Sequence, residues 1–141
     1  MTEVEQLADR LRARGLRVTP QRQVVFGLLD GNQEHPTVEA LHDAARATLP
    51  AISLKTVYQT VHDLESLGEV RLLDVGTGAV RVDPNVERPH HHLLCTECHR
   101  VRDVLTDVGE VHLAERDRQG FTIRDVQVVF RGTCDRCTAG T

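Results

Sequence analysis

Four cysteines in two C-x-x-C pairs are the residues of this sequence best suited to chemistry. The first pair is Cys95 and Cys98, and the second is Cys134 and Cys137 near the C-terminal end. Two close pairs of thiolates match the tetrahedral coordination of Zn²⁺, which binds sulfur at about 2.3 Å. Such an ion would tie the end of the chain to the middle of its domain and contribute directly to folding. A thiol redox pair and free cysteines are the alternatives, but this pattern in a cytosolic chain favours structural zinc.

A second group, His90-His91-His92, lies just before Cys95. Alternate residues of a strand share a face, so His90 and His92 point one way and His91 points the other. With Asp103 and other nearby acids, two imidazoles make a nitrogen and oxygen ligand set that suits Fe²⁺, Mn²⁺, Zn²⁺, Co²⁺ or Ni²⁺. A surface histidine cluster without a role is the alternative, and composition alone does not decide between them.

A third group lies at the head of an amphipathic helix that begins near Ser53. Its polar side chains are Lys55, Thr56, Tyr58 and Gln59. Such side chains reach phosphates, base edges and thymine methyl groups, although many surface helices carry a similar set. A basic cluster precedes it in the sequence, formed by Arg10, Arg12, Arg14, Arg17 and Arg22. It can meet a phosphate backbone, but on charge alone a solvated helix face is the simpler interpretation.

The elements that must position these residues follow from the spacing of apolar side chains. Helices are predicted over residues 3–14, from Pro20 to about Gly31, from Thr37, and from Ser53 to about Gly68, with Thr19, Thr37 and Ser53 as N-caps. Short apolar runs over residues 70–75 and 79–82 flank a glycine-containing turn and predict a β-hairpin. Helices followed by a hairpin are the layout of a winged helix-turn-helix fold. The second helix of the helix-turn-helix motif enters the major groove of DNA.

The rest of the chain predicts a second domain. A polar linker with a proline at each end covers residues 84–89. Strands are predicted over residues 90–95 and 99–104, a helix over 106–119 and a long strand over 121–131. The fold class is therefore α+β: a winged-helix DNA-binding domain over 1–83, a hinge over 84–89, and a small α/β dimerisation and metal-binding domain with a four-cysteine zinc site over 90–141. So small a C-terminal domain is expected to need a metal or a partner to complete its core.

Composition narrows the functional classes. The chain has 141 residues, a net charge of −4 and 40 % hydrophobic residues, and its acidic charge does not itself indicate nucleic-acid binding. No apolar run approaches the roughly 20 residues of a membrane-spanning helix, and the polar start is unlike a secretory signal, so we expect a cytoplasmic location without membrane contact. A redox enzyme or zinc-binding adaptor is the competing class. The sequence has no phosphate-binding glycine loop, partnered nucleophile or cofactor motif, so we expect that it is not an enzyme.

Taken together, these motifs resemble the ferric uptake regulator (Fur) superfamily over nearly the whole chain. The matching segments are residues 15–22, His35-Pro36-Thr37, residues 53–58, His90-x-His92-x-x-Cys95-x-x-Cys98 and Gly132-Thr133-Cys134-x-x-Cys137. The resemblance implies a homodimeric, metal-dependent transcriptional repressor that binds double-stranded operator DNA. It also implies one structural Zn²⁺ per chain, held by the four cysteines, and one regulatory Fe²⁺ or Mn²⁺ per chain.

The same resemblance implies a regulatory metal site at the hinge, with His35, Asp83, His90, His92 and Asp103 as ligands. A metal held by ligands from both halves would fix their relative angle, so that two recognition helices in a dimer acquire the spacing of two half-sites. We expect the DNA contacts to come from Tyr58 and Gln59 toward bases, and from Lys55, Thr56 and Arg17 toward phosphates or the minor groove.

Asp103 makes the chain most similar to the peroxide-responsive repressor (PerR) type, because iron-uptake regulators usually have Glu at that place. The resemblance implies that bound Fe²⁺ reacts with hydrogen peroxide, that a histidine ligand, His35 or His90, is oxidised, and that the metal is then lost. The cysteines would hold zinc and would not be the sensor. The alternative function is an iron, manganese or zinc uptake regulator without peroxide sensing.

Overall fold

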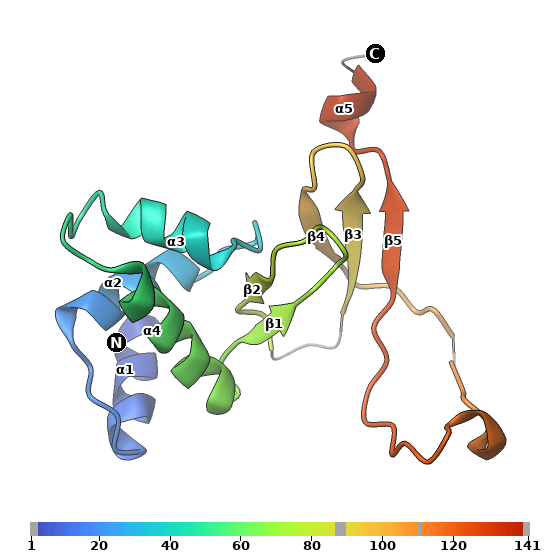
Figure 1. The fold of residues 1–141 in the computed structure, drawn as a ribbon, viewed down its shortest axis with the longest axis horizontal. Coiled ribbons are helices and arrows are strands. Elements are labelled where there is room, and N and C mark those ends of the chain that lie inside the picture. The colour runs from blue at the N-terminus through green and yellow to red at the C-terminus, as the bar shows by residue number, and fades with distance from the viewer. Residues whose placement is uncertain (1–2, 87–89, 110, 140–141) are drawn as a thin grey trace. The chain divides into compact units, whose positions relative to one another are not determined.

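A computed structural model describes residues 3–86, 90–109 and 111–139 of the chain. The chain divides into two compact units, Met1–Arg88 and Pro89–Thr141, whose elements are labelled in Figure 1. The predicted hinge over residues 84–89 lies partly outside the described residues, so the predicted domain limits stay a prediction. Within the described residues, no helix is long and apolar enough to cross a membrane.

The first unit consists of four helices followed by a two-stranded sheet. The helices are α1 (Glu3–Ala13), α2 (Pro20–Leu29), α3 (Val38–Ala45) and α4 (Leu54–Ser66), and the strands are β1 (Arg71–Leu73) and β2 (Arg81–Asp83). The side-chain oxygens of Thr19, Thr37 and Ser53 each accept a hydrogen bond from the backbone N–H three residues later. The predicted N-caps are therefore confirmed, and they define where α2, α3 and α4 begin.

One apolar core, mostly of aliphatic side chains, holds this unit together. It is built from the inward faces of all four helices and from β2, and its buried members include Leu11, Phe26, Leu29, Leu41, Ile52, Val57, Val61, Leu64 and Val82. Burial of one face of α4 leaves its opposite face exposed, because residues three and four apart share a side of a helix. Tyr58 and Gln59 lie on that exposed face.

The hairpin of β1 and β2 also positions the segment that precedes α3. The two strands pair antiparallel with Leu72 opposite Val82. The Val82 N–H donates to the Pro36 carbonyl at 2.8 Å, and Thr37 forms an antiparallel bridge with Arg81. The chain around His35 is therefore held beside β2.

The second unit is built on a three-stranded sheet of order β4-β3-β5. The strands are β3 (His91–Cys95), β4 (Val101–Val104) and β5 (Val129–Gly132). β3 pairs antiparallel with β4 and parallel with β5. Between β4 and β5 the chain forms an arm that carries the short 3-10 helix η1 (Glu115–Asp117), and α5 (Asp135–Ala139) follows β5 (Figure 1).

Two predicted elements of this unit are wrong in their extent. The helix expected over residues 106–119 is absent from its described residues except for η1, and the strand expected over 121–131 is confined to β5. Gly109 adopts a φ of +75°, which interrupts a helix. The apolar side chains of the arm are exposed, namely Leu105, Val111, Leu113, Phe121, Ile123 and Val126. A short helix draws most of its stability from packing of its apolar face, and the described part of this single chain leaves that face uncovered.

Candidate metal centres and nucleic-acid interface

The four cysteines gather at one end of the sheet of the second unit. Cys95 ends β3, and Cys98 lies in the turn between β3 and β4. Cys134 follows β5, and Cys137 lies within α5. The Thr96 N–H donates to the Gly132 carbonyl at 2.9 Å, so the chain segments that leave β3 and β5 stay side by side. Parallel pairing of these two strands therefore brings the two C-x-x-C pairs together.

The geometry of this cluster fits a tetrahedral zinc ion. Cys95 Sγ lies 3.8 Å from Cys137 Sγ, and Cys98 Sγ lies 3.7 Å from Cys134 Sγ. A tetrahedron with Zn–S bonds of about 2.3 Å has edges of about 3.8 Å. No cysteine of the chain forms a disulfide. The Cys98 and Cys134 N–H groups donate to Cys95 Sγ, and they lower the pKa of the Cys95 thiol to about 6, which favours the thiolate that binds metal.

Three of the predicted regulatory ligands meet in the second unit. In the register of the sheet, His92 on β3 lies opposite Asp103 on β4. His90 Nε2 lies 3.3 Å and His92 Nε2 lies 3.4 Å from the same oxygen, Asp103 Oδ1. The two imidazole rings pack edge to face with centroids 4.7 Å apart. Both histidines are buried, whereas the Asp103 side chain is 23 % exposed, so two buried nitrogens converge on a carboxylate that water still reaches.

The other two predicted ligands meet in the first unit. His35 Nε2 lies 3.7 Å from Asp83 Oδ1, and both side chains are almost fully buried. His35 Nδ1 is 2.9 Å from the Gln33 carbonyl. Because that carbonyl only accepts, His35 carries its proton on Nδ1 when the ring is neutral, and Nε2 presents a lone pair on the side of Asp83. A backbone carbonyl that accepts from the other ring nitrogen is common behind metal-bound histidines.

Each unit by itself thus contains buried histidine beside an aspartate, which is buried in the first unit and partly exposed in the second. Asp83 ends β2, and the Asn85 N–H donates to its carboxylate at 2.9 Å, which fixes the side chain. His91 differs from its neighbours, because its Nδ1 accepts from the Val128 N–H at 3.3 Å. His91 therefore positions the chain that enters β5, in agreement with its assignment to the opposite face of the strand.

The exposed face of α4 carries the residues predicted to contact DNA. Lys55 and Gln59 are exposed, Thr56 is half-buried, and Tyr58 is 47 % exposed. The Tyr58 hydroxyl donates to Glu39 Oε1 on α3 at 2.6 Å. This bond is the main cause that raises the pKa of Tyr58 and lowers the pKa of Glu39.

The carboxylate of Asp63, on α4, has partners that the sequence analysis did not identify. Arg22 on α2 donates to Asp63 Oδ2 at 2.6 Å, and Gln59 Nε2 donates to Asp63 Oδ1 at 2.9 Å. The spacing of four residues between Gln59 and Asp63 is a recognisable helix-surface signal. The partnership with Arg22 spans 41 residues of sequence, and no local pattern indicates it.

The predicted basic cluster is largely neutralised within the first unit. Arg10 forms a two-bond ion pair with Glu69, Arg12 pairs with Asp9, and Arg22 pairs with Asp63. Arg14 donates to the Leu67 carbonyl at 3.5 Å. Arg17 is exposed, and within the described part of the chain the structure gives it no ion-pair partner. Of the five arginines, Arg17 is therefore the one best placed for a phosphate.

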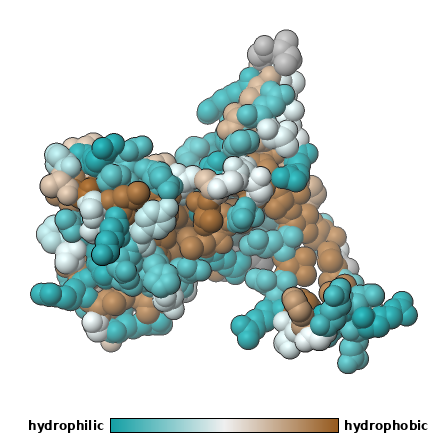
Figure 2. Space-filling view, in the orientation of Figure 1, coloured by the Kyte–Doolittle hydropathy of each residue, from teal (hydrophilic) through white to brown (hydrophobic). Residues whose placement is uncertain are grey.

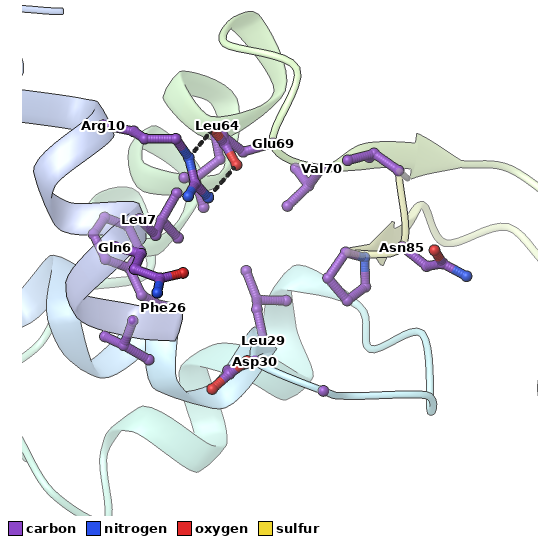
Figure 3. A pocket seen from close by; sticks show the side chains of 14 residues that line it. Gln6, Leu7, Arg10, Phe26, Leu29, Asp30, Leu64, Glu69, Val70 and Asn85 are labelled. Carbon is purple, nitrogen blue, oxygen red and sulfur yellow. Dashed lines mark hydrogen bonds and ion pairs between the residues drawn. The ribbon is translucent and has the colours of Figure 1, made fainter. Parts of the chain in front are cut away.

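A cavity in the first unit lies between α1, the end of α2 and the chain that follows β2. Its wall combines apolar side chains such as Leu7, Phe26 and Leu29 with the Arg10–Glu69 ion pair (Figure 3). The described residues that line it include no histidine or cysteine. The metal-binding chemistry of the chain therefore lies elsewhere.

Known proteins of one family match nearly the whole chain. A sequence profile of the ferric uptake regulator family matches residues 13–131. The transcriptional regulator FurA of Mycobacterium tuberculosis is 32 % identical over 139 residues, which cover 98 % of this chain and 94 % of that protein. The peroxide-responsive repressor PerR of Staphylococcus aureus is 28 % identical over 136 residues, covering 96 % and 91 %.

Solved structures show the same fold. The ferric uptake regulator Fur of Helicobacter pylori has a TM-score of 0.74 at 18 % identity and covers 96 % of this chain and 91 % of its own. A zinc-bound manganese uptake regulator has a TM-score of 0.72 at 27 % identity, covering 94 % and 99 %. The α+β fold class predicted from the sequence is therefore confirmed.

Proposed function

The chain belongs to the ferric uptake regulator family and is a metal-responsive transcriptional regulator, and from that premise we propose that it is a homodimeric repressor that senses peroxide through a bound divalent metal. Because its relatives are transcriptional regulators, the expectation that it is not an enzyme is confirmed. The observation that carries the proposal is a group of buried histidine and aspartate side chains in each unit, of which Asp103 alone is partly exposed. In each group, imidazole nitrogens converge on a carboxylate oxygen, and this is a donor set that divalent metal ions accept.

Structural zinc is the first component of the proposal. Cys95, Cys98, Cys134 and Cys137 would hold one Zn²⁺ per chain. The sulfur spacing supports this assignment, because it equals the edge of a zinc–sulfur tetrahedron within 0.1 Å. The zinc-bound relative supports it also. With their lone pairs committed to zinc, these thiolates would be poor redox sensors.

The regulatory ion is the second component. We assign His35 and Asp83 of the first unit, and His90, His92 and Asp103 of the second, to one Fe²⁺ or Mn²⁺ ion. Imidazole nitrogens and carboxylate oxygens are ligands that both ions accept. Sharing one ion between the units would restrict their relative motion, and the DNA-competent arrangement would become more populated.

Peroxide sensing distinguishes this proposal from plain metal sensing. The short carboxylate of Asp103 supports it through the resemblance to peroxide-responsive repressors, and the similarity to PerR is in line with it. Fe²⁺ held there would supply the redox chemistry by which hydrogen peroxide oxidises one of its own ligands. One peroxide oxygen would add to the imidazole of His35 or His90 and the other would leave as water, and the oxidised ligand would release the metal. The second candidate is an iron, manganese or zinc uptake regulator, and the comparably similar FurA and the manganese uptake regulator favour it.

DNA binding and dimerisation are the third component. The exposed face of α4 would enter the major groove of operator DNA in the cytoplasm, with Tyr58 and Gln59 toward bases. Lys55, Thr56 and Arg17 would contact phosphates or the minor groove, and the exposed position of Arg17 supports its part. The uncovered apolar side chains of the arm support a second copy of the chain as partner, and they are visible as brown surface in Figure 2.

The proposal is tested by measuring operator binding of the full chain loaded with Fe²⁺ or with Mn²⁺, before and after brief treatment with hydrogen peroxide. The Fe²⁺-loaded protein is expected to lose DNA binding and to gain one oxygen on the peptide that carries His35 or His90, detected by mass spectrometry. The Mn²⁺-loaded protein is expected to keep both its mass and its DNA binding.

Two variants sharpen this test, one that changes a proposed ligand and one that serves as a control. Asp103→Glu keeps a carboxylate ligand and is expected to retain metal-dependent DNA binding while it responds less to peroxide. His62→Asn changes an exposed histidine on α4 outside both ligand groups, and its histidine oxidation is expected to equal that of the unmodified chain. Intact histidines and undiminished DNA binding in the Fe²⁺-loaded protein would favour the metal-uptake function instead.

A further inference from the structure

Asp63 lies between an arginine of one helix and a glutamine of the proposed DNA-contacting face. Its Oδ2 accepts from Arg22 on α2 at 2.6 Å, and its Oδ1 accepts from Gln59 Nε2 at 2.9 Å. The two carboxylate oxygens thus serve two different partners. Each side chain of the Arg22–Asp63 ion pair is only 19 % exposed, so water screens this pair less than a surface pair.

The chemistry of the carboxylate determines which way the Gln59 amide faces. An ionised carboxylate only accepts hydrogen bonds, so the amide nitrogen of Gln59 must face Asp63. The Gln59 carbonyl oxygen, Oε1, then faces away from Asp63, together with the second hydrogen of Nε2. Among the residues that the structure describes, none donates a hydrogen bond to Oε1.

Arg22 makes this arrangement compatible with DNA. An unpaired carboxylate on a DNA-contacting helix would repel the phosphate backbone, and Arg22 neutralises Asp63. The ion pair also joins α2 to α4, which restrains the position of the carboxylate. When DNA displaces water from the exposed side of Gln59, reversing the amide would leave two oxygen acceptors facing each other, which is costly in a desolvated interface.

We propose that Asp63, held by Arg22, is a positioning residue that orients Gln59 to present one acceptor and one donor to the major groove, and that this orientation gives a preference for adenine. This inference rests on the proposed contact between α4 and DNA, and it specifies the base that one side chain of that helix selects.

The preference follows from the edges of the bases in the major groove. Adenine offers the N6 amino donor and the N7 acceptor, which match the Oε1 acceptor and the remaining N–H of Gln59. Guanine offers two acceptors, O6 and N7, and would place O6 against Oε1. The oriented glutamine therefore matches adenine twice and opposes guanine once.

Changing Asp63 to asparagine is expected to reverse the orientation. In Asp63→Asn, the amide oxygen takes over the bond from Arg22, and the amide nitrogen turns toward Gln59. Gln59 Oε1 then accepts from that nitrogen, and both hydrogens of Nε2 face the groove. Two donors match the O6 and N7 acceptors of guanine, so the selected base at this one position is expected to change from adenine toward guanine.

The experiment selects bound duplexes from a randomised DNA pool with the metal-loaded full chain and reads the base preference at every position by sequencing. The unmodified chain is expected to enrich adenine at one position in each half-site. Gln59→Ala is expected to lose the preference at that position alone, and Asp63→Asn to shift it toward guanine. Glu65→Gln removes the same charge from an exposed position of α4 and is expected to leave every position unchanged.

A second measurement keeps the test independent of how the Asp63 variant folds. Replacing the selected adenine by purine without its 6-amino group is expected to weaken binding of the unmodified chain about tenfold, and to leave Gln59→Ala unaffected. Equal binding of both duplexes by the unmodified chain, or an unchanged adenine preference in a folded Asp63→Asn, would overturn the inference while the proposed function stands. Failure of every metal-loaded form to bind DNA would overturn the proposed function and the inference together.

Discussion

At the scale of single residues, the bond between Tyr58 and Glu39 gives a spectroscopic handle on the exposed face of α4. Tyr58 is the only tyrosine of the chain, which has no tryptophan, so tyrosinate absorbance reports on this residue alone. Glu39 raises the pKa of Tyr58, chiefly through the hydrogen bond from the phenol. The bond exists while Glu39 is ionised and Tyr58 is protonated. It is therefore lost as the pH falls through the lowered pKa of Glu39, and as the pH rises through the raised pKa of Tyr58.

Glu39→Ala is accordingly expected to move the Tyr58 titration to lower pH, toward the ordinary value for tyrosine. The measurement is absorbance of tyrosinate against pH. Glu65→Ala is the control, since Glu65 is exposed and its carboxylate is not bonded to Tyr58. Identical titration curves for Glu39→Ala and the unmodified chain would show that the hydrogen bond does not persist in solution.

The sequence was sufficient to predict most residues of the candidate sites, but not the partners of those residues on other helices. Cysteine spacing predicted the four-cysteine cluster, because two C-x-x-C pairs allow few other arrangements. The alternation of His90 and His92 likewise predicted their common face. Glu39 and Asp63, in contrast, meet partners on other helices, and such pairings depend on how helices pack. The ion pairs of the basic cluster could not be predicted for the same reason, since Arg10 pairs with Glu69, 59 residues away.

At the scale of elements, Ser53 determines where the proposed recognition helix begins. Its hydroxyl oxygen accepts from the Thr56 N–H at 3.1 Å, satisfying one of the free donors at the start of α4. Ser53→Ala is expected to destabilise the folded chain by about 1 kcal/mol, measured by urea unfolding. Ser66→Ala, at the opposite end of α4, is expected to change stability by less than about 0.5 kcal/mol. Equal effects of the two substitutions would exclude a capping role.

The proposed zinc would stabilise the short helix α5. Five residues are too few to form a stable helix alone, and zinc bound by Cys134 and Cys137 together with Cys95 would fasten α5 to the end of β3. Cys137→Ser is therefore expected to lose zinc during dialysis against a mild chelator, while the unmodified chain keeps one zinc per chain.

Hydrogen exchange gives a second measurement of how the proposed zinc holds the ends of β3 and β5 together. The Thr96 N–H, which donates to the Gly132 carbonyl, is expected to exchange much faster in Cys137→Ser. Exchange at Leu64, in the core of the first unit, is the internal control and is expected to stay slow. A folded, zinc-free chain that keeps Thr96 protected would contradict the zinc assignment.

The elements of the first unit could be predicted from the sequence more closely than those of the second. Its helices have caps and apolar faces that pack within the same unit, so local signals agree with tertiary contacts. The helix expected over residues 106–119 has a suitable apolar pattern. Its formation, however, depends on what covers Leu105, Val111 and Leu113, and a sequence pattern does not show whether the cover comes from the same chain.

At the scale of the whole molecule, the uncovered apolar residues of the arm are the clearest sign of a missing partner. Phe121 is 73 % exposed, and Ile123 and Val126 are also exposed. Alternation of apolar and polar side chains over residues 121–124 is the pattern of a strand with one covered face. Of the described residues between β4 and α5, those of β5 (Val129–Gly132) form the strand that joins the sheet, and the proposed homodimer would cover the apolar residues before it.

The dimer is best tested by placing a charge on that apolar face. Phe121→Asp with Ile123→Asp would bury two carboxylates in the proposed interface, and burying an unpaired charge is costly. We expect a rise of at least about 2 kcal/mol in the free energy of association, which is about thirtyfold in the dimer dissociation constant, measured by sedimentation over a concentration series.

Thr122→Asp with Arg124→Asp is the control, because it places two carboxylates on the alternate, polar positions. It is expected to leave the dimer dissociation constant within a few-fold of that of the unmodified chain. Zinc content checks that each variant retains the four-cysteine cluster. A dimer of unchanged strength in the first variant would show that the apolar residues of the arm face something other than a second copy of the chain.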